Sequence, residues 1–251
     1  MVAPGAAVRR SLVQRARPLR LTGRGRWLIL APHPDDETLG MGGLIARLAA
    51  AGTAPIVAFL TDGSGSHTNA PGWTPQRIAS LRRAEAHEAL RDLGVTTPAV
   101  QLGWADANPH SPESKAFARS VRQLTSLCRR HHVRHLAVTW PGEPHCDHEG
   151  AASLAQAVAQ SANLQLHHYL VWGWTRPDLA AVLGPVRTHR IRTSGFRPAQ
   201  RRALSRHRSQ RGGRILGGTA FRLPRSMQAL VDQPFTLLLE PPRAPRTIHR
   251  A

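Results

Sequence analysis

The segment LILAPHPDDETLGMGG, residues 28–43, decides the fold of this chain. A run of aliphatic residues, typical of a buried strand, stops at the polar segment His33–Glu37, which ends in three consecutive acids. Apolar residues then recur at a period close to 3.6, which predicts a helix over residues 38–51. The segment is therefore a strand, a polar turn and a helix. Because adjacent carboxylates repel each other near a low-dielectric interior, we expect a cation among these acids.

The same alternation continues along the chain. Apolar runs and helical patterns predict strands over 27–31, 55–61, 100–104 and 136–140, and helices over 38–51, 74–93, 111–131 and 150–161. Weaker patterns predict strands over 166–174, 186–191 and 234–240 and a basic helix over 197–210. Strands that alternate with helices imply right-handed crossovers. We therefore predict a three-layer, Rossmann-like α/β fold with a mainly parallel sheet and helices on both faces.

Length and composition fit one globular domain. The chain has 251 residues, of which 41% are hydrophobic and 20% charged, enough for a substantial core. We expect a flexible basic arm over 1–26, a single domain over 27–240 and a tail over 241–251. No apolar run reaches the ~18 residues of a membrane span, and no secretory signal is visible. Since the two cysteines, Cys128 and Cys146, suit a reducing compartment, we expect a cytoplasmic protein.

The net charge of +19 comes from the two ends of the chain. Residues 27–178 hold 12 Lys and Arg against 13 Asp and Glu, whereas residues 1–26 hold seven Arg and no acid, and residues 179–251 hold fifteen Arg against two acids. Lys115 is the only lysine, a bias that the composition of the coding DNA can produce. Solvated, compositional basicity is our first interpretation, an anionic substrate or membrane surface the second, and nucleic acid the third.

Polar residues follow each of the first four predicted strands. These clusters are His33–Glu37, Thr61–Gly63, Trp104 with Asp106, and His145–Glu149. In parallel sheets, ligands bind beyond the carboxyl ends of the strands. We therefore predict that the four clusters meet on one rim of the sheet and form the functional site there.

The segments HPDDE and HCDH together supply three histidines and three aspartates. A catalytic zinc takes three protein ligands from histidine and carboxylate side chains and leaves a fourth position open. His33, Asp36 and His148 would meet that requirement, with one Zn²⁺ per chain. Asp35 could then accept a proton from the attacking water, and the ion would relieve the repulsion between the adjacent acids.

His145 and Asp147 occupy alternate positions of the second segment. A histidine held by a carboxylate has a raised pKa and a fixed tautomer. With Asp147 as its support, His145 could stabilise an oxyanion or protonate a leaving amine.

These motifs resemble the signatures of the LmbE-like, or PIG-L, zinc-dependent deacetylases. The family's (A/P)HPDDE segment after the first strand matches APHPDDE at 31–37. Its HPDH segment after the fourth strand matches HCDH at 145–148, where Cys146 stands in place of proline. The resemblance covers about residues 27–210, and the two motifs are specific as a pair.

The resemblance implies a role for each matched residue. Zinc would be bound by His33, Asp36 and His148. The general base would be Asp35, and His145, supported by Asp147, would assist the tetrahedral intermediate. Arg82, in the run RRAEA, matches an arginine that contacts the substrate. The implied substrate is an N-acetylglucosamine-type amino sugar or glycoconjugate that loses its N-acetyl group.

Plainer interpretations exist for several of these features. HPDD could be an Asx-type turn that caps the next helix, but this leaves HCDH unexplained. The glycines of LGMGG, residues 39–43, lack the third glycine of a dinucleotide fingerprint and predict close helix packing instead. For Trp73, Trp104 and Trp140, core packing is the first interpretation and stacking on a sugar the second.

The sequence therefore predicts a zinc-dependent hydrolase that removes an N-acetyl group from an amino sugar. One alternative keeps the zinc but changes the amide, for example to that of a thiol conjugate. Another, from a different class, is a basic protein whose flanks hold nucleic acid, and we rank it last. The expected partner is a small amino sugar or glycoconjugate, neutral or anionic. The sequence indicates no oligomeric state.

Overall fold

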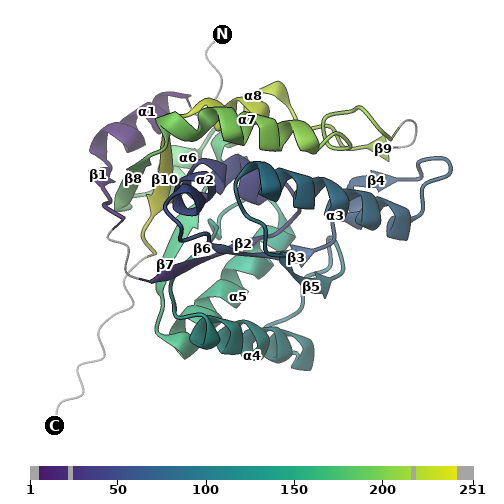
Figure 1. Cartoon of the computed structure of the whole chain (residues 1–251), viewed down its shortest axis with the longest axis horizontal. Coiled ribbons are helices and arrows are strands. Elements are labelled where there is room, and N and C mark those ends of the chain that lie inside the picture. The colour runs from purple at the N-terminus through teal and green to yellow at the C-terminus, as the bar shows by residue number, and fades with distance from the viewer. Residues whose placement is uncertain (1–5, 22–24, 216–218, 242–251) are drawn as a thin grey trace.

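The computed structural model describes residues 6–21, 25–215 and 219–241 of the chain. Figure 1 shows a sheet between two layers of helices. Eight strands form this sheet in the order β1-β8-β10-β7-β6-β2-β3-β5, and β4 and β9 form a separate pair. The predicted α/β fold with a mainly parallel sheet and helices on both faces is confirmed. No helix within the described ranges is long and apolar enough to cross a membrane.

The elements have the following bounds. The strands are β1 (Arg17–Pro18), β2 (Arg26–Ala31), β3 (Ile56–Thr61), β4 (His67–Thr68), β5 (Val100–Trp104), β6 (Val133–Thr139), β7 (Gln165–Tyr169), β8 (Thr188–Arg192), β9 (Thr219–Ala220) and β10 (Phe235–Leu239). The α-helices are α1 (Ala6–Arg15), α2 (Gly42–Ala50), α3 (Pro75–Asp92), α4 (Lys115–Arg130), α5 (Cys146–Ala162), α6 (Leu179–Leu183), α7 (Arg197–Arg206) and α8 (Arg225–Gln228). Shorter turns are η1 (Glu37–Met41, π), and the 3₁₀ turns η2 (Ser64–Ser66), η3 (Trp172–Thr175), η4 (Ser194–Phe196) and η5 (Ala229–Asp232).

Strand β2 lies in the parallel part of the sheet, between β6 and β3. Its side chains alternate between two cores. Ile29 packs in the core beneath α2, α3 and α7, and Leu28 and Leu30 pack in the core above α4 and α5. Burial on both faces explains why this strand is a continuous apolar run. Strand β10 is antiparallel to both of its neighbours, β7 and β8.

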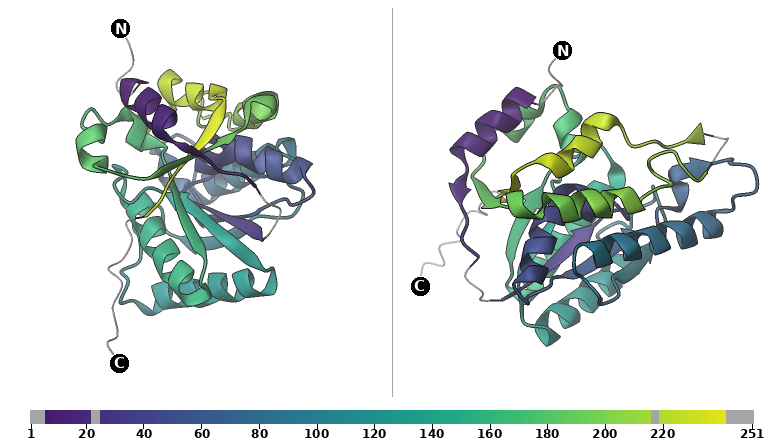
Figure 2. Two further views of the ribbon diagram at one scale, coloured as in Figure 1. Left: turned by 90° about the vertical axis from the view of Figure 1, so that its left-hand side faces the viewer. Right: turned by 45° about the horizontal axis from the view of Figure 1, so that its top comes forward.

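The N-terminal segment differs from the flexible arm that we expected. Residues 6–15 form α1, and β1 pairs in parallel with β8 at the edge of the sheet. The guanidinium of Arg190 donates to the carbonyl oxygen of Val13 at 2.8 Å. Figure 2 shows α1 on the same side of the sheet as α7 and α8. Composition did not indicate this contact because an open strand edge can pair with a backbone whatever its side chains are. The tail beyond Pro241 lies outside the described residues.

Some predicted bounds shift in the structure. Helix α5 begins at Cys146, four residues before the predicted start, because His145 caps it and its ring nitrogen Nδ1 accepts from the backbone N–H of Asp147 at 3.2 Å. The predicted strand over 166–174 ends at Tyr169, and η3 follows it. The earlier start of α5 matters for function because it places most of the HCDH segment in the first turn of a helix.

The glycines after β2 allow the close packing that we predicted. A Cβ on Gly40 would lie 2.3 Å from the ring of Tyr169, and one on Gly42 would lie 2.7 Å from the side chain of Gln200. The Tyr169 hydroxyl donates to the carbonyl oxygen of Leu30 at 3.1 Å. The turn that follows the acids is therefore held against β7 and α7.

Two buried histidines on β7 lead to a prediction about stability. His167 and His168 are 1% and 5% exposed. Burial lowers the pKa of His167 to about 3 and that of His168 to about 4. Between these values and ~6.5 the unfolded chain binds protons that the folded chain does not, so stability falls as pH falls. Each histidine should contribute up to about 1.4 kcal/mol per pH unit to this loss.

Denaturant titrations between pH 4 and 8 measure this effect. The His167→Gln variant should show a shallower fall in unfolding free energy below pH 6 than the parent protein. His87→Gln, which changes an exposed histidine on α3, should keep the parent slope. Equal slopes in all three proteins would contradict the assignment of acid sensitivity to His167.

Candidate active site and metal centre

Polar residues that follow β2, β5 and β6 meet on one rim, so three of the four predicted clusters contribute side chains to it. His33 Nε2 lies 3.4 Å from Asp106 Oδ1 and 2.9 Å from Asp147 Oδ2. The residues surround a cavity of about 410 Å³, whose polar lining includes His33, Asp35, Asp36, Arg82, Asp106 and His145. Asp62 does not take part in this lining, because its carboxylate accepts from the N–H of Ser64 at 3.0 Å and stabilises the turn after β3.

Three side chains form a compact group that could hold a metal ion. The ligand atoms of His33, Asp36 and His148 all lie within 4.8 Å of one another. Asp36 Oδ2 lies 3.3 Å from His33 Nδ1 and 3.3 Å from His148 Nε2. One carboxylate oxygen therefore lies between two imidazole nitrogens that come from different parts of the chain.

The donor set fits a divalent metal. His148 is fully buried, and each of its ring nitrogens faces a carboxylate: Nε2 lies 3.3 Å from Asp36 Oδ2 and Nδ1 lies 3.5 Å from Glu143 Oε2. The buried carboxylate of Asp36 lies between this ring and that of His33, so the group favours a cation, either a proton or a metal ion, at that point. Two imidazoles and one carboxylate are a donor set that zinc takes in catalytic sites.

The electrostatics of the group also favour a cation. Burial by itself would lower the pKa of His33, but hydrogen bonds to Asp106, Asp147 and Asp36 raise it well above its usual range. For His148, burial is likewise opposed by Asp36 and Glu143, and its pKa is raised to about 9. The site therefore attracts positive charge, whether as protons or as a metal ion.

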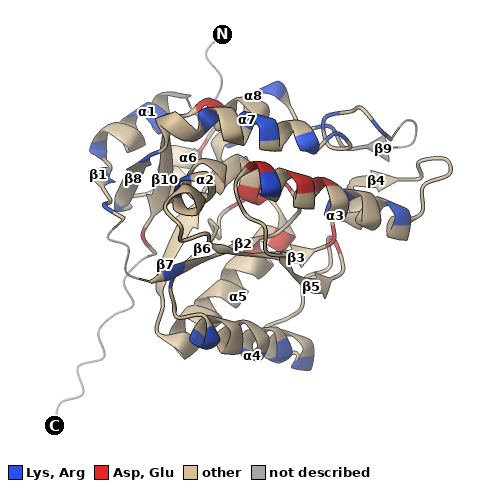
Figure 3. Cartoon of the chain, viewed as in Figure 1, with Lys and Arg blue, Asp and Glu red and all other residues tan. Residues whose placement is uncertain are grey.

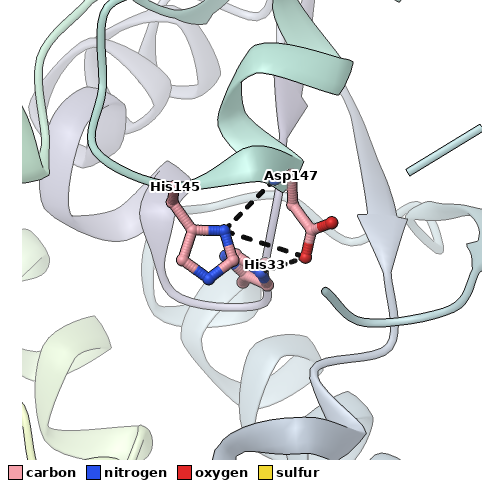
Figure 4. Close-up of side chains that lie close together, drawn as sticks. All are labelled: His33, His145 and Asp147. Atoms are coloured by element: carbon pink, nitrogen blue, oxygen red, sulfur yellow. Dashed lines mark hydrogen bonds and ion pairs between the residues drawn. The ribbon is translucent and has the colours of Figure 1, made fainter. Parts of the chain in front are cut away.

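Asp147 has a different principal partner from the one we predicted. Figure 4 shows its carboxylate, at the start of α5, against the ring of His33. Its Oδ2 lies 2.9 Å from His33 Nε2 and 3.9 Å from His145 Nδ1, and it also accepts from the N–H of Ala107 at 2.9 Å. A carboxylate behind a ligating histidine fixes the ring orientation and raises its basicity. Asp147 is therefore placed to support a metal ligand.

His145 also differs from expectation. Its pKa is lowered, first by burial and then by the nearby rings of His33 and His148, with Asp147 opposing the shift. Its Nδ1 accepts from a backbone N–H, so in the neutral ring Nε2 carries the proton. The side chain is 36% exposed and lines the cavity. It can therefore present a neutral N–H donor to a bound molecule.

Asp35 is held in an unusual backbone conformation. Its φ is 151°, a region that residues other than glycine rarely adopt, and its N–H donates to Glu37 Oε2 at 3.0 Å. Burial raises the pKa of its carboxyl group to about 6, although the charge of Arg82 opposes the shift. Such strain is typical of functional sites and is of order 1–3 kcal/mol. Asp35 therefore presents a buried carboxylate of raised pKa at the wall of the cavity, beside the group of His33, Asp36 and His148.

Arg82 occupies the cavity wall but is not a free substrate contact. The residue is 4% exposed, and its guanidinium donates to the carbonyl oxygens of Gly63 at 3.0 Å and Pro34 at 2.9 Å. Nη2 also lies 3.4 Å from Asp35 Oδ2. We therefore infer that Arg82 positions Asp35 and the turn around it, in addition to any contact with substrate.

A glycine makes room for Arg82, which gives a second prediction. Gly63 has a φ of +69°, and a Cβ there would lie 2.2 Å from Arg82 Nη1. Gly63→Ala should displace the guanidinium from Asp35 and lower turnover by about 10-fold or more, because small misplacements of catalytic groups are costly. Initial-rate kinetics and denaturant unfolding measure the two consequences.

Gly72→Ala is the matched control. Gly72 has a φ of +73°, but a Cβ there would have nothing within 4 Å. Both variants should lose about 1–2 kcal/mol of stability from the left-handed backbone, whereas only Gly63→Ala should lose turnover. Equal turnover in the two variants would show that the position of Arg82 against Asp35 does not affect activity.

Several residues of the site were missed from the sequence. Glu143 lies 3.5 Å from His148 Nδ1 through its Oε2, and its carboxylate accepts from the N–H groups of Val171 and Gly173. It precedes HCDH by two residues, and this proximity was the only available signal. The aromatic wall of the cavity is Trp172 with Phe221, whose ring centroids are 5.7 Å apart.

None of the three tryptophans considered from the sequence lines this cavity. Trp104 is 2% exposed, and its indole N–H donates to the Ser120 hydroxyl. Trp140 packs against a small cluster around Leu170. Trp73 lies under the guanidinium of Arg77, with 4.1 Å between the guanidinium carbon and the ring centroid. Packing accounts for Trp140, whereas Trp73 and Trp104 also border a neighbouring hollow of about 580 Å³ that shares Asp106 with this cavity.

The rim carries a buried histidine and carboxylate group that could hold a metal ion, and comparison with known proteins identifies the family. A family model described as "PIG-L: GlcNAc-PI de-N-acetylase" matches residues 28–159, just over half of the chain. The chain therefore belongs to the PIG-L family. The match includes both HPDDE and HCDH, so the resemblance drawn from these motifs is confirmed.

The chain spans somewhat more than half the length of the individual relatives that it matches. It is 31% identical over 161 residues to 1D-myo-inositol 2-acetamido-2-deoxy-alpha-D-glucopyranoside deacetylase of Mycobacteroides abscessus, covering 56% of this chain and 57% of the relative. It is 28% identical over 173 residues to diacetylchitobiose deacetylase of Thermococcus kodakarensis, covering 67% and 58%.

A solved structure shares the fold. The conserved protein TT1542 from Thermus thermophilus is 24% identical, with a TM-score of 0.61 that covers 90% of this chain and 100% of that one. At this level of identity the likeness concerns the fold alone. It shows that the arrangement extends beyond the family match into the C-terminal third of the chain.

Proposed function

We propose that this protein is a zinc-dependent hydrolase that removes the N-acetyl group from an N-acetylglucosamine-type sugar. The single observation that carries the proposal is the buried group of His33, Asp36 and His148, which lies beside Asp35, a residue with a strained backbone. The two relatives named above are deacetylases whose names contain acetamido or acetyl sugars. A zinc ion in this group would polarise an amide carbonyl and acidify water.

The residues of the chain can carry the proton transfers of amide hydrolysis. Asp35 would take a proton from water as the water oxygen bonds to the acetyl carbon. The N–H of His145 Nε2, on the cavity wall, would donate a hydrogen bond to the oxygen that gains negative charge. The carbon–nitrogen bond then breaks, the amine nitrogen receives the proton held by Asp35, and acetate and the free amino sugar are released.

The proposal extends to an anionic substrate. A second hollow of about 680 Å³ is lined by arginines, among them Arg208, Arg211, Arg222 and Arg225, and Leu223 lines both this hollow and the active-site cavity. None of these four arginines forms an ion pair with a carboxylate in the described ranges. Figure 3 shows how basic residues spread over α1, α7 and α8. A phosphate or carboxylate on the far part of the substrate would complement this hollow.

Acetate release from a panel of substrates tests the proposal. The panel contains N-acetylglucosamine, its inositol conjugate, diacetylchitobiose and nucleotide-linked N-acetylglucosamine, each with zinc-loaded protein. Acetate release from at least one of these sugars is expected. If the zinc-loaded protein releases no acetate from any of them, the deacetylase proposal is wrong.

Arg222→Gln should raise KM for the nucleotide-linked sugar more than Arg202→Gln, which changes an exposed arginine on α7 outside the hollow.

Two further measurements on the same protein distinguish the remaining alternatives. Amide cleavage of a thiol conjugate without sugar cleavage would favour the other amidase. Nucleic-acid binding that survives His148→Ala and falls steeply with salt would favour the basic binding protein. For the compartment we propose the cytoplasm, because both cysteines, Cys128 and Cys146, are free thiols.

A further inference from the structure

A third cavity lies between α1 and the body of the domain, away from the catalytic acids. Its volume is about 360 Å³. Its wall is mixed, and the apolar side chains include Val13, Leu170, Trp174, Leu230, Phe235 and Leu237. The polar residues on the wall are Arg9, Arg10, Gln14 and Gln233. A cavity of this size that combines apolar side chains with a small number of polar groups is the usual form of a small-molecule site.

Arg9 is the unusual member of this wall. Its Nη1 is buried and has no hydrogen-bond partner among the described residues. The guanidinium lies over the ring of Trp174, 5.4 Å from the centroid, and burial lowers the pKa of the side chain. Among the residues that the structure describes, no carboxylate forms an ion pair with Arg9 or Arg10. A half-buried cation whose nitrogen lacks an acceptor is unfavourable, and contact with an aromatic ring recovers only part of that cost.

We propose that this cavity binds a small amphiphilic anion, with its carboxylate on Arg9 and its apolar chain among the leucines and Trp174. At roughly 30 Å³ per non-hydrogen atom, the cavity holds about a dozen such atoms. A medium-chain carboxylate such as octanoate has this size. The charge on Arg9 selects an anion, and the apolar wall selects against a small, fully hydrated ion such as inorganic phosphate.

The site is separate from the catalytic centre but adjoins it through one side chain. Leu39 lines both this cavity and the active-site cavity, and it belongs to η1, the turn that follows the catalytic acids. The proposal goes beyond the deacetylase function and does not depend on it. The bound anion would also fasten α1 to the domain, because the same ligand would contact Arg9 on α1 and the side chains of the body.

Calorimetric titration of the full chain with three probes tests the selectivity. Octanoate should bind at least 10-fold more tightly than octanol, which lacks the charge, and than inorganic phosphate, which lacks the chain. Arg9→Gln should weaken octanoate binding by about 10- to 100-fold, the range for a hydrogen bond to a charged group. Arg15→Gln, which changes an exposed arginine on the same helix, should bind octanoate as the parent does.

A carboxylate could also bind a metal ion in the active site, so the titration is done on protein stripped of divalent metal. The proposal predicts unchanged octanoate affinity after stripping. Affinity that disappears with the metal, equal affinity for octanol, or full affinity in Arg9→Gln would each overturn it. Leu237→Trp fills the cavity while keeping Arg9, so loss of binding there is expected even if Arg9→Gln folds poorly, and retained binding would place the ligand elsewhere.

Discussion

Replacing His148 by alanine is expected to remove tight zinc binding and deacetylase activity together. His148 Nε2 lies 3.3 Å from Asp36 Oδ2, and the ring is fully buried, so its loss would leave the metal group one ligand short. Partners outside the ligand shell already contribute about 10- to 100-fold to metal affinity, and a direct ligand should contribute at least as much. Metal analysis after dialysis, with activity at saturating zinc, measures both losses.

His145→Ala is the control for this variant. His145 lies in the same segment, and its ring centroid is 5.4 Å from that of His148, but it belongs to the cavity wall. It should keep zinc and lose turnover, since we assign His145 to the reacting oxygen and not to the metal. Stoichiometric zinc in His148→Ala would show that the ligand assignment is wrong. Zinc loss in His145→Ala would move the metal toward the neighbouring group of His33, His145 and Asp147, which the geometry also brings within 4.8 Å.

Replacing Asp35 by asparagine should keep the fold and the zinc but lower turnover by about 10²- to 10⁴-fold, the usual contribution of a general base. The amide is nearly isosteric and still can accept from Arg82 Nη2, which lies 3.4 Å from Asp35 Oδ2. It cannot take a proton from water at neutral pH. Single-turnover acetate release and metal content, measured on the same preparation, test the two halves of the prediction.

Asp36→Asn is the control variant, because it distinguishes the loss of a metal ligand from the loss of a general base. Asp36 is the next residue, equally buried, and its Oδ2 lies between the two histidines of the metal group. It should lose zinc as well as turnover. If Asp35→Asn and Asp36→Asn lost equal amounts of zinc, the division of the pair into base and ligand would be wrong, and the proposed mechanism would fail with it.

The sequence was sufficient for the fold class and for the position of the site. Leu28–Ala31 is apolar at every position because β2 is covered on both faces, and His33 follows only two positions later because the strand ends at the rim. The pattern of a strand, a polar turn and a helix depends on neighbours in the chain, so it can be read locally. The family motifs supplied the candidate ligands for the same reason.

Only the tertiary structure decided which partner each of those residues contacts. Asp147 lies against His33, a residue 114 positions away. Arg82, on α3, donates to the carbonyl oxygen of Pro34 in the loop after β2. Glu143 behind His148 was not distinguishable in sequence from an ordinary loop acid. Local patterns report which side chains are polar. They do not report which distant atom each one meets, because that depends on the packing of strands and helices far apart in the chain.

The N-terminal segment shows the same limit. Its arginines predicted a solvated arm, yet α1 packs beside β8 and encloses the cavity around Arg9. A high density of charge in a sequence indicates only that the segment as a whole tends to be solvated. The energy of one buried guanidinium depends on the ring beneath it and the acceptor it lacks, and only the folded chain brings Arg9 and Trp174 together.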